Sequence, residues 1–260
     1  EPCYDSYVPN IELAGGVVVR VPLVPGTFRP NFDAIAQAIT PRTRWLILNA
    51  PNNPSGAVYS RQELRALADV LVRHPQVWVL SDDIYEHVLF DGREFCTMAQ
   101  VAPELKERTL TVNGVSKAYA MTGWRIGYCV GPLELIKAMT KLQSQSTSNP
   151  SSIGQAAALE ALTGPQGFIA ERTKIFQDRR DAVVAQLNDI PGITCHLPEG
   201  AFYVFPSCAG IIGKTTPAGQ VLKTDEDFVL YLLDSEKLAG VHGAAYGSTP
   251  FFRFSFATSI

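Results

Sequence analysis

The sequence has no long apolar run, no block of charge of one sign and little cysteine or histidine. Its apolar stretches fall well short of the ~18 residues that a membrane-spanning helix needs. Basic and acidic residues nearly balance, 22 against 25 for a net charge of −3, and the basic residues are not clustered. We therefore expect a protein that neither spans a membrane nor binds nucleic acid or anionic membrane surfaces.

The few cysteines and histidines form no recognisable set. The five cysteines are odd in number and lack C-x-x-C spacing, and the four histidines are scattered. This pattern predicts neither a zinc site nor a disulfide framework, so no metal is expected. Unpaired thiols fit a reducing compartment best, and we expect a cytoplasmic protein.

What the chain does contain is a composition that can form a core. Hydrophobic residues make up 46% and charged residues 18% of the 260 residues, which excludes disordered, collagen-like and coiled-coil proteins. The sequence begins at Glu1 instead of Met, and it stops shortly after an alternating, strand-like run. These two ends suggest a piece of a longer protein.

Apolar strands alternate with helical patterns over the first two-thirds of the chain. Runs rich in apolar and β-branched residues predict strands at residues 17–24, 44–49, 77–81, 109–112 and 125–130. Helical spacing, with a capping box at Ser60 and Glu63, predicts helices at residues 32–39, 60–72, 133–144, 152–162 and 165–187. This alternation is typical of an α/β protein with a mostly parallel sheet.

The pattern of predicted strands and helices changes after Pro191. Short strands at 201–205 and 251–257 flank a helix at 225–233, a pattern typical of a smaller α+β domain. We therefore predict a large domain over residues 1–165. Residues 166–260 would hold a connecting helix and a small C-terminal domain, and both domains would be incomplete.

Polar side chains follow three successive apolar strands. The first strand leads to Asn53, the second to Asp82 and Tyr85, and the third to Ser116 and Lys117. Because the carboxyl ends of neighbouring parallel strands meet at one edge of a sheet, an amide, a carboxylate, a phenol and an amine are expected to converge. The sequence has no G-x-G-x-x-G, G-x-x-x-x-G-K-[ST] or G-x-S-x-G motif. The set suits carbonyl chemistry through a Schiff base with pyridoxal phosphate, which needs a lysine and an acidic partner for its ring nitrogen.

Four ordered motifs extend this argument into a family resemblance. NAPNNPSG at 49–56, SDDIYE at 81–86, SKAYAMTGWRIGY at 116–128 and FRFSFA at 252–257 resemble motifs of class I pyridoxal-phosphate-dependent aminotransferases. The likeness covers essentially the whole chain and is nearest to the bacterial aspartate aminotransferases. It implies the fold type I architecture, with N- and C-terminal parts missing, and pyridoxal 5′-phosphate as the cofactor.

The resemblance implies three catalytic residues. Lys117 would link to the cofactor and shuttle the α-proton of the substrate. Asp82 would keep the pyridine nitrogen of the cofactor protonated, which makes the ring an electron sink. Tyr85 would donate a hydrogen bond to the 3′-oxygen of the ring.

The resemblance also implies binding residues. Arg125 and Ser116 would contact the cofactor phosphate, and Asn53 would contact the ring oxygen and the substrate. Arg253 would bind the substrate α-carboxylate through two parallel hydrogen bonds, which a lysine could not reproduce. Tyr4 would lie near the ring and the substrate, although aspartate enzymes of this branch usually carry Trp there.

Each of these residues also has a simpler interpretation. Asp82 could cap the turn after its strand, and Asn53 could be a turn residue between two prolines. Arg125 and Arg253 could be solvated surface arginines, and Tyr4 could be a packed aromatic residue. The motif context favours the functional interpretation.

The implied activity is a ping-pong transamination between L-aspartate- or glutamate-type amino acids and 2-oxo acids, by a homodimer. A kynurenine/glutamine-type transaminase or a cysteine-conjugate β-lyase on the same scaffold is an alternative, because residues 1–7 resemble those enzymes. A non-catalytic effector domain of a transcription regulator is another. The lysine motif and Arg253 argue against this last alternative, and a folded but inactive fragment also stays open.

Overall fold

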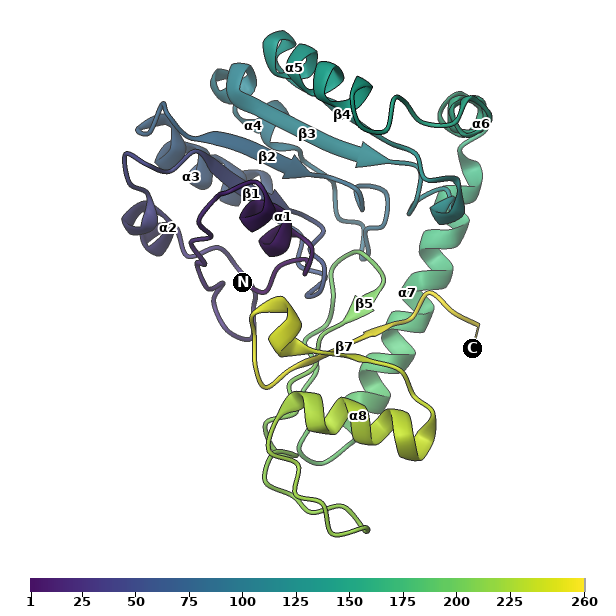
Figure 1. The fold of residues 1–260 in the computed structure, drawn as a ribbon. Helices are drawn as coiled ribbons and strands as arrows, with labels where there is room; N and C mark the ends of the chain where they lie inside the picture. Colours follow the sequence, from purple (N-terminus) through teal and green to yellow (C-terminus); the bar gives the residue numbers. More distant parts are fainter. Residues whose placement is uncertain (260) are drawn as a thin grey trace. The chain divides into compact units, whose positions relative to one another are not determined.

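The computed structural model describes residues 1–259, which form two compact units (Figure 1). The sheet unit holds Phe32–Pro51 and Val58–Thr173. The C-terminal unit holds Glu1–Asn31, Asn52–Ala57 and the chain from Lys174 onward. No helix of the described residues is long and apolar enough to cross a membrane.

The sheet unit is built on four neighbouring strands, β1 (Trp45–Asn49), β2 (Trp78–Asp82), β3 (Thr109–Gly114) and β4 (Gly127–Val130) (Figure 1). β1, β2 and β3 are parallel, and β4 pairs with β3 in the antiparallel sense. The register places Asn49 beside Asp82, and Asp82 beside Val112. The carboxyl ends of three strands therefore meet at one edge, and the predicted mostly parallel α/β architecture is confirmed.

Four helices of the sheet unit lie close to their predicted positions, and the short helix α4 (Met98–Val101) was not predicted. The four are α2 (Phe32–Ala38), α3 (Arg61–Val72), α5 (Leu133–Ser144) and α6 (Ser152–Thr163), with short 3-10 helices at Pro103–Arg108 and Thr122–Trp124. The capping box before α3 is present, because the Ser60 hydroxyl accepts from the Glu63 backbone and the Glu63 carboxylate accepts from the Ser60 backbone. One face of α3 is buried, as its apolar spacing predicts.

Two strand predictions were wrong in whole or in part. Residues 17–24 form no strand; Val17 is 89% exposed, and Val24 makes only an isolated bridge to Arg29. β-Branched residues favour an extended backbone, but a strand needs a partner that pairs with its peptide groups. The strand predicted from residue 125 starts only at Gly127, because Arg125 has a left-handed backbone with φ of 56°.

The C-terminal unit contains a small antiparallel sheet in the order β5 (Tyr203–Val204), β7 (Phe252–Ser255), β6 (Val241–His242). α1 (Tyr7–Leu13), α8 (Asp225–Glu236) and a 3-10 helix, η3 (Gly243–Tyr246), complete it. α7 (Gly167–Asn188) begins in the sheet unit and continues into this unit. The ring of Phe252 packs edge-on against Phe228 of α8, with centroids 5.3 Å apart, so this face of β7 belongs to the core.

A buried carboxylate joins three of these elements. Asp225, at the start of α8, is only 1% exposed. Its Oδ2 accepts hydrogen bonds from the backbone N–H groups of Ala244 in η3, at 3.2 Å, and of Phe251 before β7, at 3.3 Å. Because a buried carboxylate must be satisfied, these bonds hold η3 and the start of β7 in a defined position.

Candidate active site

The end of β2 presents a carboxylate at the edge of the parallel sheet. Asp82 is half-buried, and its backbone carbonyl accepts a hydrogen bond from the side-chain amide of Asn49 at 3.0 Å. One side-chain oxygen of Asp82 accepts the N–H of Ile84 at 3.2 Å, which is the turn-capping contact of the simpler interpretation. A carboxylate has about four acceptor positions, so capping and a role toward a ligand are compatible.

Two predicted residues of the sheet unit lie together. The Nζ of Lys117 is 5.5 Å from the centroid of the Tyr85 ring, and Tyr85 is only 3% exposed. Lys117 itself is half-buried. An ammonium beside the face of a buried phenol is partly desolvated and confined in orientation, as a lysine with a chemical role requires.

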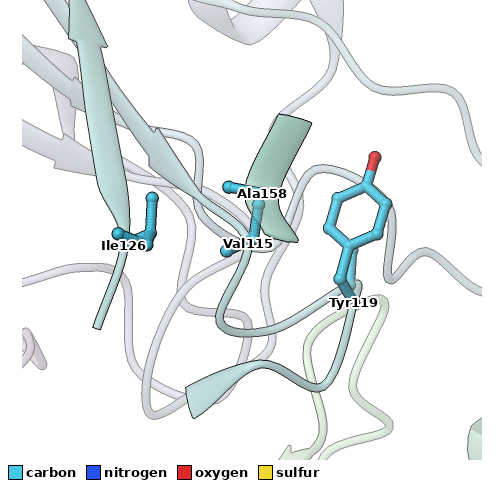
Figure 2. Close-up of a cluster of buried hydrophobic side chains, with 5 residues drawn as sticks. Val115, Tyr119, Ile126 and Ala158 are labelled. Carbon is cyan, nitrogen blue, oxygen red and sulfur yellow. The ribbon is translucent and has the colours of Figure 1, made fainter. Parts of the chain in front are cut away.

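The loop that carries Lys117 is anchored by its apolar residues. Val115, Ala118 and Tyr119 are buried in a cluster with Ile126 and Ala158, of which Figure 2 labels all but Ala118. The Tyr119 hydroxyl also lies 3.0 Å from the side-chain oxygen of Gln166. The apolar residues on either side of Ser116 and Lys117 are therefore held in the core, which leaves these two polar side chains half-buried.

Gly114, which ends β3, is closely surrounded by its neighbours. A Cβ there would lie 3.0 Å from the Ile126 carbonyl oxygen, 3.1 Å from Cδ1 of Ile84 and 3.2 Å from Cα of Gly127. A larger residue would require β4 and the turn after β2 to shift by a few tenths of an ångström. The close packing of the strands accounts for glycine at this position.

A second connection between β2 and β3 was missed by sequence reasoning. The side-chain amide of Asn113 donates to Oε1 of Glu86 at 2.6 Å, and the Asn113 oxygen accepts the N–H of Gly114 at 2.8 Å. The N–H of Asp83 also donates to the Val112 carbonyl at 2.9 Å. The turn that carries Tyr85 is thus tied to the strand that leads to Lys117. Asn113 follows an apolar strand, as the predicted residues do, and that was the available signal.

Asp83 is the other residue that sequence reasoning missed. It is only 4% exposed, and the Ser81 hydroxyl donates to its Oδ1 at 2.7 Å. Burial raises the pKa of the Asp83 carboxyl to about 7, from 3.8. The two neighbouring aspartates therefore differ in environment, with Asp83 buried and Asp82 at the half-exposed edge.

Arg125 is exposed and immediately precedes Ile126 of the buried cluster. Its left-handed backbone directs the chain into β4, and its Nη1 donates to the Thr122 carbonyl at 2.9 Å. This bond uses one of the five N–H groups of the guanidinium. An exposed guanidinium and the half-buried Ser116 hydroxyl are donors suited to a phosphate group.

The C-terminal unit brings together Asn53 and Arg253, which are 200 residues apart in the sequence. Nη1 of Arg253 donates to Oδ1 of Asn53 at 2.9 Å. The guanidinium also lies over two tyrosine rings, 4.4 Å from the centroid of Tyr203 and 5.1 Å from that of Tyr246. The Nε of Arg253 is buried and has no hydrogen-bond partner among the described residues. The arginine therefore lies against two aromatic rings and keeps unused donors.

Asn53 is fixed by the loop on which it lies. Within this loop, Oδ1 of Asn52 accepts from the Ser55 hydroxyl at 2.7 Å. Gly56 has φ of 71°, and its carbonyl accepts the N–H groups of Glu199 and Gly200, both at 2.9 Å. A side chain at position 56 would meet the loop at residues 198–200, so glycine is required for this contact.

Tyr4 lies at the surface of the C-terminal unit. It is 39% exposed, and its ring packs edge-on against Tyr7 with centroids 5.5 Å apart. The preceding residue, Cys3, donates its N–H to the Tyr246 carbonyl at 3.1 Å, which ties this segment to η3. The packed-aromatic interpretation describes the contact that Tyr4 makes with Tyr7.

The donor set fits pyridoxal phosphate. The sheet unit supplies an amine, a phenol and a carboxylate at Lys117, Tyr85 and Asp82, with cationic and hydroxyl donors at Arg125 and Ser116. These groups match an aldehyde, a ring oxygen, a ring nitrogen and a phosphate. The unused donors of Arg253 suit a carboxylate.

Comparison with known proteins agrees with this chemistry. The profile of the family "Aminotransferase class I and II" matches residues 1–259. The chain is 57% identical over 259 residues to the aspartate aminotransferase of Rhizobium meliloti strain 1021, covering 99% of this chain and 63% of that protein. It is 56% identical over 259 residues to the aspartate/prephenate aminotransferase of Cereibacter sphaeroides, covering 99% and 65%.

Solved structures show the same fold. The aspartate aminotransferase structure from Rhizobium meliloti superposes with a TM-score of 0.96 at 56% identity, covering 100% of this chain and 65% of that one. The Thermus thermophilus aspartate aminotransferase with maleate gives 0.88 at 41% identity, covering 100% and 64%. The chain thus spans somewhat less than two-thirds of the length of these relatives. It belongs to the class I and II aminotransferase family, whose members of the aspartate aminotransferase type use pyridoxal phosphate.

Proposed function

We propose that this chain is the larger part of a pyridoxal-phosphate-dependent transaminase that moves an amino group between L-aspartate- or glutamate-type amino acids and 2-oxo acids. The observation that carries the proposal is the position of Lys117 beside the buried Tyr85 ring, on the loop after β3, the strand whose Val112 pairs with Asp82. A lysine, a phenol and a carboxylate in this arrangement are the groups that the cofactor needs.

In the proposed mechanism, pyridoxal phosphate supplies an electron sink for the charge that develops when the substrate loses its α-proton. With the cofactor bound, the Nζ of Lys117 would act first as the base that takes the proton from the substrate Cα and then as the acid that gives it back to a carbon of the cofactor. The Asp82 carboxylate keeps the ring nitrogen protonated, because a nearby negative charge favours the cationic form. The Tyr85 hydroxyl donates toward the ring oxygen.

Binding roles complete the proposal. Arg125 and Ser116 hold the phosphate, and Asn53 contacts the ring oxygen and orients Arg253. Arg253 binds the α-carboxylate that every amino acid substrate carries. Tyr4 contributes an aromatic surface near the substrate.

Two further parts of the proposal concern the longer protein. We place its domain boundary at residues 165/166, and we propose a homodimer.

We also propose a cytoplasmic location. All five cysteines of the chain are free thiols in the structure, which supports this proposal.

The relatives also suggest a second oxo acid. Because the Cereibacter sphaeroides protein, 56% identical to this chain, is named an aspartate/prephenate aminotransferase, prephenate is a candidate acceptor beside 2-oxoglutarate. An assay with aspartate as donor and each oxo acid in turn would rank them. Release of pyruvate and ammonia from a cysteine conjugate would instead favour the β-lyase alternative.

Reductive trapping tests the site. The protein that carries these residues should bind pyridoxal phosphate and turn yellow, and borohydride should then attach the cofactor permanently to the peptide that contains Lys117. A Lys117→Ala variant, treated identically, should carry no label. Label on any other of the eight lysines, in the wild-type protein, would overturn the assignment.

A further inference from the structure

The strand register places an aromatic ring beside Arg253. Tyr203 on β5 pairs with Ser255 on β7, and Arg253 precedes Ser255 by two residues, so Tyr203 and Arg253 share a face of the sheet as diagonal neighbours. The opposite face carries Phe252, which is 1% exposed and packs on α8. The guanidinium of Arg253 therefore lies on the tyrosine side of the sheet, away from the apolar core.

A second ring comes from another element of the same unit. Tyr246 ends η3 and is 2% exposed, with its ring centroid 5.1 Å from the Arg253 guanidinium. Two constraints fix this ring, because Asp225 accepts from Ala244 in η3 and the Tyr246 carbonyl accepts from Cys3. Burial raises the pKa of the Tyr246 hydroxyl well above its usual range, so the phenol stays neutral at physiological pH.

The two rings and Asn53 constrain different parts of the arginine. Asn53 accepts from Nη1, and the rings of Tyr203 and Tyr246 meet the guanidinium carbon at 4.4 and 5.1 Å. No carboxylate among the described residues forms an ion pair with Arg253, and Nε is buried without a partner. A half-buried cation that gains attraction from π-faces keeps N–H groups for a ligand.

We propose that Tyr203 and Tyr246 are positioning residues for substrate binding, holding the Arg253 guanidinium in one orientation so that it meets an α-carboxylate through two parallel hydrogen bonds. The inference rests on the proposed function, because it takes the carboxylate from the amino acid or oxo acid substrate. Since every substrate carries that carboxylate, the effect of the tyrosines is independent of the substrate side chain.

The test replaces the rings and measures binding as well as turnover. In the cofactor-loaded protein, Tyr246→Leu and Tyr203→Leu should each raise the Kd of maleate, a dicarboxylate that cannot be transaminated, by roughly 3- to 30-fold in calorimetry. KM for aspartate and for an aromatic amino acid should rise by similar factors. Tyr246→Phe and Tyr203→Phe, which keep the ring, should stay within about 3-fold of wild type. Tyr231→Leu, a matched change on α8, should leave the Kd unchanged.

A double-mutant comparison separates positioning from general damage. Lysine keeps the charge but has no planar guanidinium, so Tyr246→Leu should have a smaller effect in the Arg253→Lys background than in wild type. If circular dichroism shows that Tyr246→Leu does not fold, Tyr203→Leu and Tyr203→Phe test the inference instead, through the same measurements of maleate Kd and the same comparison with the Arg253→Lys background. Equal loss in both backgrounds, or unchanged maleate binding in the leucine variants, would overturn the inference. Failure of the wild-type protein to bind pyridoxal phosphate would instead refute the proposed function.

Discussion

The two units hold their predicted residues in different ways. In the sheet unit, Asp82 ends β2 and is placed by backbone register, while Lys117 lies on the loop after the adjacent strand β3 and is held by the buried residues around it. In the C-terminal unit, Asn53 and Arg253 are 200 residues apart and meet through one hydrogen bond between side chains, with aromatic rings on the cation. Main-chain pairing tolerates most side-chain changes, whereas an arrangement made by side chains is lost with any one of them.

The largest expected effect lies in the sheet unit and would show that its lysine is chemically required. Lys117→Ala should reduce kcat by about 10⁴-fold or more, because a positioned acid–base group contributes about 10²–10⁴-fold and this lysine, in the proposed site, would also link to the cofactor. Single-turnover loss of the α-proton from deuterated substrate is the measurement. Lys137→Ala, on the exposed face of α5, is the control. Comparable loss in both variants would contradict the prediction.

The next effect tests whether Asp82 is catalytic or only caps its turn. Asp82→Ala should reduce kcat by about 10²–10³-fold with little change in KM, because the ring nitrogen loses the charge that keeps it protonated. Asp82→Asn is the sharper variant, since its side-chain oxygen can still accept from Ile84 while the charge is removed. Asp82→Asn should resemble Asp82→Ala in kcat and wild type in thermal stability. If it retains full kcat, the capping interpretation is correct.

A similar but substrate-wide effect is expected in the C-terminal unit. Arg253→Lys should lower kcat/KM by a factor that corresponds to about 2–4 kcal/mol of lost transition-state stabilisation, the range for a charged pair that loses a partner. The loss should be the same for aspartate and for an aromatic amino acid, because both carry the α-carboxylate. A loss confined to aspartate would mean that Arg253 binds the side chain, and no loss would mean that the arginine is solvated.

The smallest effect concerns stability and Asp83. Its folded-state pKa of about 7 lies above the 3.8 of an exposed carboxyl, so the folded state binds more protons between these values and stability falls as pH rises through this window. Asp83→Asn removes the titration and should raise the free energy of unfolding by about 1–3 kcal/mol at about pH 8, with a smaller gain near pH 4.5. Urea unfolding at the two pH values is the measurement, with Asp189→Asn on the surface as control. An equal effect at both pH values would exclude the titration of Asp83 as its cause.

Local signals predicted much of the sheet unit. The capping box at Ser60 and Glu63 and the apolar runs of β1 to β3 are dictated by short-range geometry, and each was confirmed. The run at 17–24 had the same local composition and formed no strand, because pairing depends on a partner that composition does not reveal. The left-handed backbone at Arg125 was equally invisible, since only glycine and a few polar residues mark that conformation in a sequence.

In the candidate site, too, some features could be predicted from the sequence and others depended on the tertiary structure. The sequence by itself determined the family, because positions 53, 82, 85, 117 and 253 place an amide, a carboxylate, a phenol, an amine and a guanidinium in motifs that resemble those of the aminotransferases. Only the tertiary structure decided that Glu86 pairs with Asn113, that Asp83 is buried, and that Tyr203 and Tyr246 flank Arg253. Spacing along the chain sets which groups follow a strand. Contacts between distant segments depend on packing, and packing is a property of the whole fold.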